Sequence, residues 1–202
     1  MAGLAAVNQV GESIVKLLDA RRELLSADGL LGPVPKALKI NHLSLGDLAT
    51  KTEPTSDCSL TCYRVKMSDH PAQRLRTGDA PSSTSLAVDL HYLVTAWPSK
   101  VADEQAIISW VMLELLANPL LDRSLLPNDG SWGSDETVQI VPDTMSDDEL
   151  FRIWGALQRR YRMSATFKAR VVRIGYGQTP DYPAVVASRF GFANVDPMAE
   201  TV

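Results

Sequence analysis

The chain of 202 residues is poor in cysteine, modest in aromatic residues and has no excess of positive charge. Cys58 and Cys62 are its only cysteines. In an extended segment they would lie roughly 13 Å apart at ~3.3 Å per residue, whereas a disulfide needs Cα atoms within ~7 Å. This spacing argues against a bridge and suits a reducing compartment. The net charge of −4 argues against a nucleic-acid binder, which usually carries a basic excess.

The sequence also lacks a long hydrophobic run. Its most apolar segment, residues 107–116, is broken by Ser109 and Glu114 and is far shorter than the ~20 residues of a membrane span. The N-terminus has no basic start and carries Glu12 within its apolar stretch, so we expect no signal peptide and synthesis in the cytoplasm. Phosphate-binding glycine loops and metal-ligand spacings are absent. We therefore expect no cofactor and no metal site.

What is present is an alternation of helical and strand-like periodicity. Helices are predicted over 4–26, 103–118 and 147–157, and strands over 36–43 (weakly), 60–67, 86–97, 138–141 and 165–174. This order predicts an α+β domain with a small mixed or antiparallel sheet of about four strands flanked by helices. The domain is expected to span residues 1–176, and 177–202 to be a C-terminal tail, either an extended arm or disordered.

The clearest strand, 86–97, carries three polar residues on one face: Asp89, His91 and Thr95. A carboxylate that orients an imidazole is half of a nucleophilic site, so a small enzyme using Asp89 and His91 is one hypothesis. The sequence supplies no third partner, which favours the alternative of a polar sheet face that makes structural or interface contacts. We therefore expect no catalytic residue.

The segment 103–118 predicts a helix that is apolar almost all round. Such a helix is covered on more than one side. Either the sheet and the first helix enclose it, or a neighbouring subunit does.

The distribution of charge suggests an interface. Residues 129–149 contain seven acids and no base, and residues 152–173 contain seven bases and no acid. The dipole of the helix over 147–157 explains part of this pattern. The remainder predicts acidic and basic patches suited to head-to-tail contacts in a ring, the alternative being a solvated surface of mixed charge. Trp132, which lies in a loop between Gly130 and Gly133, is a candidate exposed contact residue. The candidate interface residues are Trp132, Asp135, Glu136, Asp147, Asp148, Arg159, Arg160, Arg162, Lys168 and Arg170.

Several short motifs also follow one another in a characteristic order. They are Leu-His-Tyr-Leu at 90–93 after a strand-like 86–89, Glu-Gln at 104–105, Leu-Leu at 120–121, Met-Ser-Asp-Asp-Glu-Leu at 145–150 with Ile-Trp at 153–154, and Tyr-Arg-Met-Ser at 161–164. In this order and spacing the sequence, over roughly residues 5–190, resembles the cap or tail-terminator proteins of phage-tail-like contractile injection systems, specifically the N-terminal domain of the cap. Ser109 and Trp110 stand where that family often has a glycine, and the match is weakest after Asp181.

The resemblance implies a non-enzymatic protein with a phage tail-terminator-like fold. Such a cap is expected to form a homohexameric ring that binds the inner tube protein and the sheath protein, ends tube growth and anchors the last sheath layer. It implies neither nucleic-acid binding nor membrane insertion, and a particle that either stays inside the cell or is released. A tube initiator at the other end of the same particle is the alternative within this resemblance.

Overall fold

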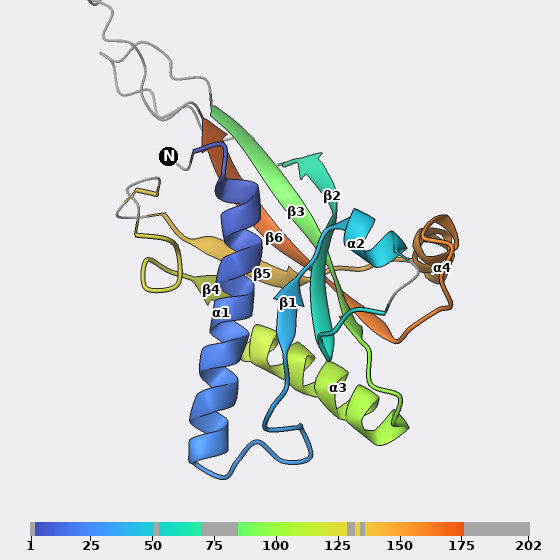
Figure 1. Ribbon diagram of the computed structural model, residues 1–202. Coiled ribbons are helices and arrows are strands. Elements are labelled where there is room, and N and C mark those ends of the chain that lie inside the picture. The colour runs from blue at the N-terminus through green and yellow to red at the C-terminus, as the bar shows by residue number, and fades with distance from the viewer. Residues whose placement is uncertain (1–2, 51–52, 70–84, 129–131, 134–135, 176–202) are drawn as a thin grey trace, which may run out of the picture.

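Six strands form one sheet, and different helices cover its two faces in the computed structural model (Figure 1). The structure describes residues 3–50, 53–69, 85–128, 132–133 and 136–175. Its helices are α1 (Ala6–Ala27), α2 (Leu45–Ala49), α3 (Val101–Ala117) and α4 (Asp147–Ala156). Its strands are β1 (Ile40–His42), β2 (Cys58–Met67), β3 (Ser85–Ala96), β4 (Leu120–Leu121), β5 (Val138–Pro142) and β6 (Ser164–Gly175).

The strand order is β1-β2-β3-β6-β5-β4. β1 runs parallel to β2, and the other neighbouring strands are antiparallel. The α+β class and the mixed sheet are thus as predicted, but the expected number of about four strands is too low. The two edge strands, β1 with 3 residues and β4 with 2, are too short to give a clear periodic signal.

One face of the sheet packs against α1 and α3. Leu90, Tyr92 and Val94 of β3 point into this core together with the buried sides of both helices. Arg21 of α1 and the buried Glu114 of α3 form an ion pair, with Nε 2.7 Å from Oε2. The alternation of β3 therefore places its apolar side on the main core, as the sequence predicts.

The opposite face of the sheet packs against α2 and α4. Leu93 and Trp97 from the β3 side meet Leu48 of α2 and Trp154 of α4 in a second, smaller core. Both helices begin with a capping box, in which Ser44 pairs with Asp47 and Ser146 with Glu149. The Ser146 box is confirmed, whereas the helix α2, only 5 residues long, is absent from the sequence prediction.

Two parts of the sequence prediction concern residues that the structure does not describe. The expected tail, 177–202, and residues 70–84, which link the strands predicted over 60–67 and 86–97, lie outside the described residues, so the domain boundary at 176 stays a prediction. Within the described part of the chain, no helix combines the length and the apolar character that crossing a membrane requires.

Candidate functional site

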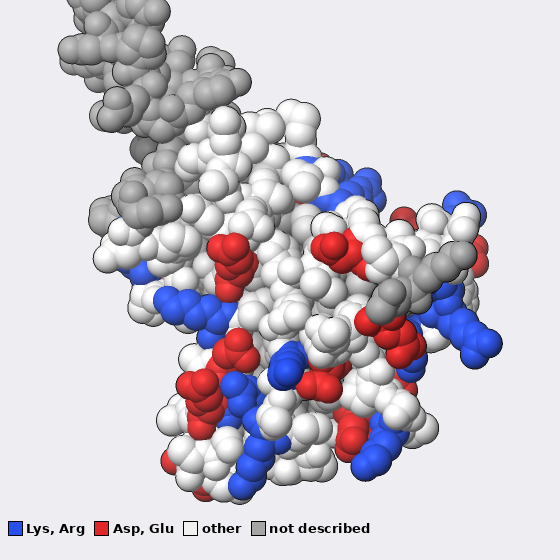
Figure 2. Space-filling model, in the orientation of Figure 1, with Lys and Arg blue, Asp and Glu red and all other residues white. Residues whose placement is uncertain are grey.

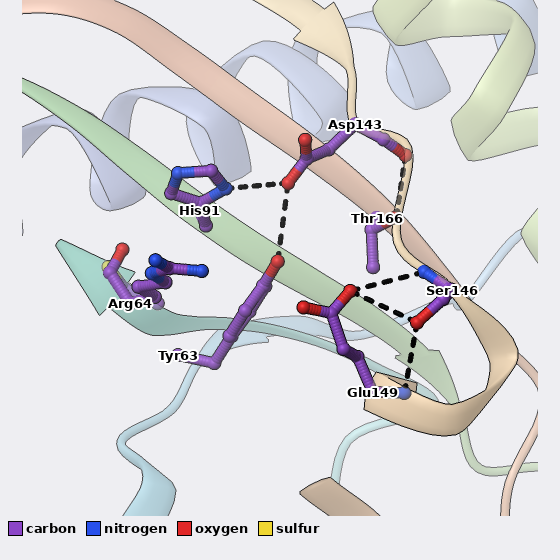
Figure 3. A network of polar contacts seen from close by, with 8 residues as sticks. Tyr63, Arg64, His91, Asp143, Ser146, Glu149 and Thr166 are labelled. Atoms are coloured by element: carbon purple, nitrogen blue, oxygen red, sulfur yellow. Dashed lines mark hydrogen bonds and ion pairs between the residues drawn. The ribbon is translucent and has the colours of Figure 1, made fainter. Parts of the chain in front are cut away.

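The polar face of β3 is covered within the subunit by a network centred on Asp143 (Figure 3). His91 Nδ1 lies 2.6 Å from Oδ2 of Asp143, and the Tyr63 hydroxyl donates to the same oxygen at 3.2 Å. The side chains of His91 and Asp143 are only 10% and 11% exposed. The carboxylate that contacts His91 is therefore that of Asp143, 52 residues further along the chain. It is not Asp89, the carboxylate that the sequence pattern suggested.

Three strands position this network. His91 lies on β3 between its register partners Arg64 of β2 and Lys168 of β6. Tyr63 lies where the register of β2 against β3 shifts, between Cys62 and Arg64. Such an irregularity redirects a side chain, and here the ring of Tyr63 meets Asp143.

Asp143 itself is fixed by its main chain. It follows β5 directly, and its N–H donates to the carbonyl of Thr166 at 3.0 Å. The Thr166 hydroxyl donates to the carbonyl of Asp143 at 2.9 Å. The carboxylate position is thus set by β6 as well as by its two side-chain partners, which no local sequence signal encodes.

The network borders a hollow of about 330 Å³. Arg64, Glu149 and Arg152 contribute charged side chains to its wall. Burial raises the pKa of Tyr63, and the negative charge of Asp143 raises it further, so the phenol stays protonated and remains a donor. The hollow therefore combines a neutral phenol, a carboxylate–imidazole pair and charges of both signs.

The geometry does not assemble a nucleophilic site. In such a site the second ring nitrogen of the histidine contacts a hydroxyl or thiol. Nε2 of His91 is buried and has no hydrogen-bond partner among the described residues. No group of three metal-ligating side chains occurs in that part of the chain either. The pair of Asp143 and His91 can instead tether the segment before α4 to the sheet.

Trp132 is not the exposed aromatic that its loop position predicts. It is only 5% exposed, and its indole Nε1 donates to Oε1 of Gln9 at 2.8 Å. Gln9 lies on the buried side of α1 and supplies the acceptor that a buried indole needs. The polar Gln9 among core positions was the sequence signal for this contact.

The predicted charged residues have different environments. Asp147, Asp148 and Arg160 are exposed, whereas Glu136, Lys168 and Arg170 are half-buried. Arg159 and Arg162 lie over the ring of Trp97, at 5.4 and 6.0 Å from its centroid, and Arg162 also pairs with Glu53 at 2.5 Å. Asp135 lies outside the described residues. On the face that carries α1 and α3, acidic and basic side chains are interspersed (Figure 2). The predicted interface role of these residues stays a prediction.

The structure adds an apolar surface to these candidates. The sheet and α1 cover one side of α3, whereas none of the described residues covers the other side. Four large apolar side chains on this open side are 47% to 66% exposed: Met112, Leu113, Leu116 and, just after the helix, Leu120. We call these four residues the α3 surface. The sequence indicated a helix that needs a second cover, and periodicity alone did not show which residues remain uncovered.

Comparisons with known proteins give a family and two distant structural likenesses. A cryo-EM structure of the sheath/tube terminator of PVC, an extracellular contractile injection system, in its extended state is 20% identical, with a TM-score of 0.42; the likeness covers 88% of this chain and 64% of that one. The tube terminating cap of the anti-feeding prophage is 19% identical, with a TM-score of 0.49, covering 85% and 60%. This chain thus spans less than two thirds of either. No curated protein matches it.

The family match is more extensive. The Pvc16 N-terminal domain family matches residues 9–188, which include every helix and strand of the structure except the first turn of α1. The chain therefore belongs to the Pvc16 N-terminal domain family.

Proposed function

We propose that this protein is the cap of a contractile injection particle. In this role it forms a homohexameric ring on the inner tube, ends tube growth and anchors the last layer of sheath. The observation that carries the proposal is the family match over residues 9–188, on which the motif order of the sequence also converges. Its partners are then further copies of itself, the tube protein and the sheath protein.

The α3 surface supports a role in assembly. Contiguous exposed apolar side chains on a soluble subunit mark sites of protein contact. Between Gln105 and Ala117 the only charged residue of α3 is Glu114, and it points inward to Arg21. The outer side of this helix is therefore uncharged over more than three turns, as expected for a surface that a neighbouring protein covers.

The Asp143 network supports a structural role rather than an enzymatic one. It contains a carboxylate, an imidazole and a phenol, and no hydroxyl or thiol of the described residues contacts Nε2 of His91. In the proposed cap, this network holds α4 and the segment before it against the sheet.

A deletion strain tests the function directly. Without the protein, electron microscopy of negatively stained particles should show tubes of irregular length and sheath that detaches or contracts. The wild-type gene should restore uniform particles. Tubes of normal, uniform length with intact sheath in the deletion strain contradict the proposal.

The end of the particle that carries the protein separates a cap from a tube initiator. A gold-labelled tag on the chain should appear at the end distal to the baseplate. Label at the baseplate end instead assigns the protein to tube initiation.

A further inference from the structure

A groove runs along the free edge of the sheet, between β1 and α1. Its volume is about 620 Å³, and its walls are residues 40–43 and one side of α1. β1 is the terminal strand of the sheet, so one of its edges has no neighbouring strand in the described part of the chain. An open strand edge beside a helix is the arrangement that receives an added strand from another chain.

The hydrogen bonds of β1 show which main-chain groups face the groove. The carbonyl of Lys39 accepts from Cys58 N–H, and the N–H of Leu43 donates to the carbonyl of Leu60. Positions 39, 41 and 43 therefore direct their main-chain groups toward β2. Since successive residues of a strand alternate, the N–H and C=O groups of Ile40 and His42 point outward. These two residues offer two donors and two acceptors to an incoming strand.

The wall formed by α1 is predominantly acidic. Glu12, Asp19 and Glu23 line the groove at intervals of about one to two turns, and Lys16 lies among them. Arg22, outside the groove wall, lies 3.6 Å from both Asp19 and Glu23, which leaves Glu12 as the acid without a cation partner among these ion pairs. Lys16 is engaged with the carbonyl of Ser124 at 3.1 Å. An incoming segment with a basic side chain therefore fits this wall better than an acidic one.

The chain carries a segment with this chemistry beyond the described residues. Residues 184–192 read Ala-Val-Val-Ala-Ser-Arg-Phe-Gly-Phe, in which β-branched and aromatic residues favour a strand. Arg189 is the single charged residue between Tyr182 and Val195. We propose that residues 184–192 of one copy pair with the outer edge of β1 in a neighbouring copy, with Arg189 directed toward the acidic side of α1. This inference rests on the proposed function, since the ring supplies the neighbouring copy.

The geometry of the sheet favours a neighbouring copy over the chain's own groove. Gly175 pairs with Ser85 at one end of β3, whereas β1 lies level with Ala96 at the other end. These ends are ~36 Å apart at ~3.3 Å per residue. The nine residues from Tyr176 to Ala184 reach at most ~32 Å when fully extended, so within one subunit only the later residues of the segment could reach β1, whereas a neighbouring copy can offer its β1 to the whole segment. A tail and a groove at opposite ends of the subunit form the head-to-tail contact from which rings close.

A peptide-binding experiment with the full chain tests this pairing. A fluorescent peptide of residues 182–195 is titrated with the protein, and binding is followed by anisotropy. The double variant E12K/E23K should weaken binding by on the order of tenfold or more. The matched control D28K reverses an exposed acid at the end of α1 outside the groove and should leave binding unchanged. A peptide with Arg189→Glu should bind the native chain weakly and the E12K/E23K chain well.

Amide hydrogen exchange locates the peptide independently. Saturating peptide should slow exchange of the Ile40 and His42 amides, which face outward, and leave Asn41, which faces β2, unchanged. The proposal is overturned by absence of binding at about 1 mM peptide, the weak limit of specific recognition, by equal binding to E12K/E23K, or by unchanged exchange at both outward amides. No tube or sheath is present in the peptide assay, so absence of peptide binding does not contradict the cap function. Normal tubes in the deletion strain would contradict the cap function and would not change the measured peptide binding.

Discussion

The imidazole of His42 occupies the space that a side chain at Gly11 of α1 would need. A Cβ built on Gly11 would lie 2.4 Å from both Cε1 and Nε2 of the ring. The helix thus has a glycine in its interior because β1 approaches it closely, and this contact forms one end of the groove between α1 and β1.

We predict that Gly11→Ala changes the sign of its effect with the residue at position 42. In the native chain the clash with His42 should destabilise the fold by about 1–2 kcal/mol, because overpacking outweighs the gain in helix propensity. In the His42→Ala background the same substitution should stabilise by about 0.5–1 kcal/mol. Urea unfolding of the four proteins measures this cycle. A stabilising Gly11→Ala in the native chain would contradict the contact.

His42 should also give the protein a pH-dependent stability. Burial lowers the pKa of His42 from its ordinary value of 6.5, while the nearby Glu12 opposes this effect. The unfolded chain then takes up a proton near pH 6.5 that the folded chain takes up only at lower pH, so the free energy of unfolding falls as the pH drops through this range. His42→Gln should remove that part of the decrease. Denaturation curves at pH 7.5 and 5.5 compare the slopes, and equal slopes for both proteins would refute the assignment.

Removing the Asp143 carboxylate should weaken the fold. Asp143→Ala leaves His91 Nδ1 and the Tyr63 hydroxyl without their common acceptor, at a cost of about 2–4 kcal/mol for two partly buried polar groups. The triple variant D143A/H91L/Y63F should recover part of this loss, since no unsatisfied donor remains. Thermal unfolding monitored by circular dichroism measures both. Unchanged stability of Asp143→Ala would show that the network does not hold this segment.

The α3 surface should matter for assembly and not for folding. Leu113→Glu and Leu116→Glu replace exposed side chains, so the free energy of unfolding of the subunit should change by no more than about 0.5 kcal/mol. The melting temperature should therefore change little. In the deletion strain the same variants should fail to restore uniform tubes. Met67→Glu, which replaces a side chain of β2 that is 67% exposed and lies outside α3, is the matched control. Full restoration by both leucine variants would exclude the α3 surface as a required contact.

The two cysteines should differ in reactivity. Burial raises the pKa of the Cys58 thiol to about 12, with a smaller contribution from Asp57, so no thiolate forms at pH 8. Cys62 is only partly buried, and its pKa is raised by burial as well. Mass spectrometry after iodoacetamide treatment should find Cys58 unlabelled and Cys62 slowly labelled in the folded protein, and both labelled in urea. Rapid native labelling of Cys58 would contradict its placement in the core.

Local patterns predicted most elements because they depend on residues that are close in sequence. The helix expected over 4–26 is α1 (Ala6–Ala27), and the strand expected over 86–97 is β3 (Ser85–Ala96). The capping box at Ser146 and Glu149 marks the start of α4 at the predicted residue. The short elements α2 and β4 were missed, because 5 and 2 residues do not complete a periodic pattern.

The functional features were harder to predict because they join distant segments. The indole of Trp132 contacts Gln9, which lies 123 positions earlier, so the prediction of an exposed Trp132 from its loop position was wrong. The carboxylate at His91 comes from Asp143 at the end of β5. In the sheet β6 lies between β3 and β5, and its Thr166 holds the main chain of Asp143 in place. His91 and Asp143 lie 52 positions apart, and no local signal identifies their contact.

The sequence by itself determined the α+β class, most helix and strand positions and the family, since these depend on local periodicity and on the order of short motifs. Tertiary structure alone decided which surfaces are open. The α3 surface is exposed because α1 and the sheet cover only one side of an apolar helix. Among the described residues the β1 edge has no neighbouring strand, because the strand order places a parallel strand of 3 residues at the border of the sheet through pairings between distant segments.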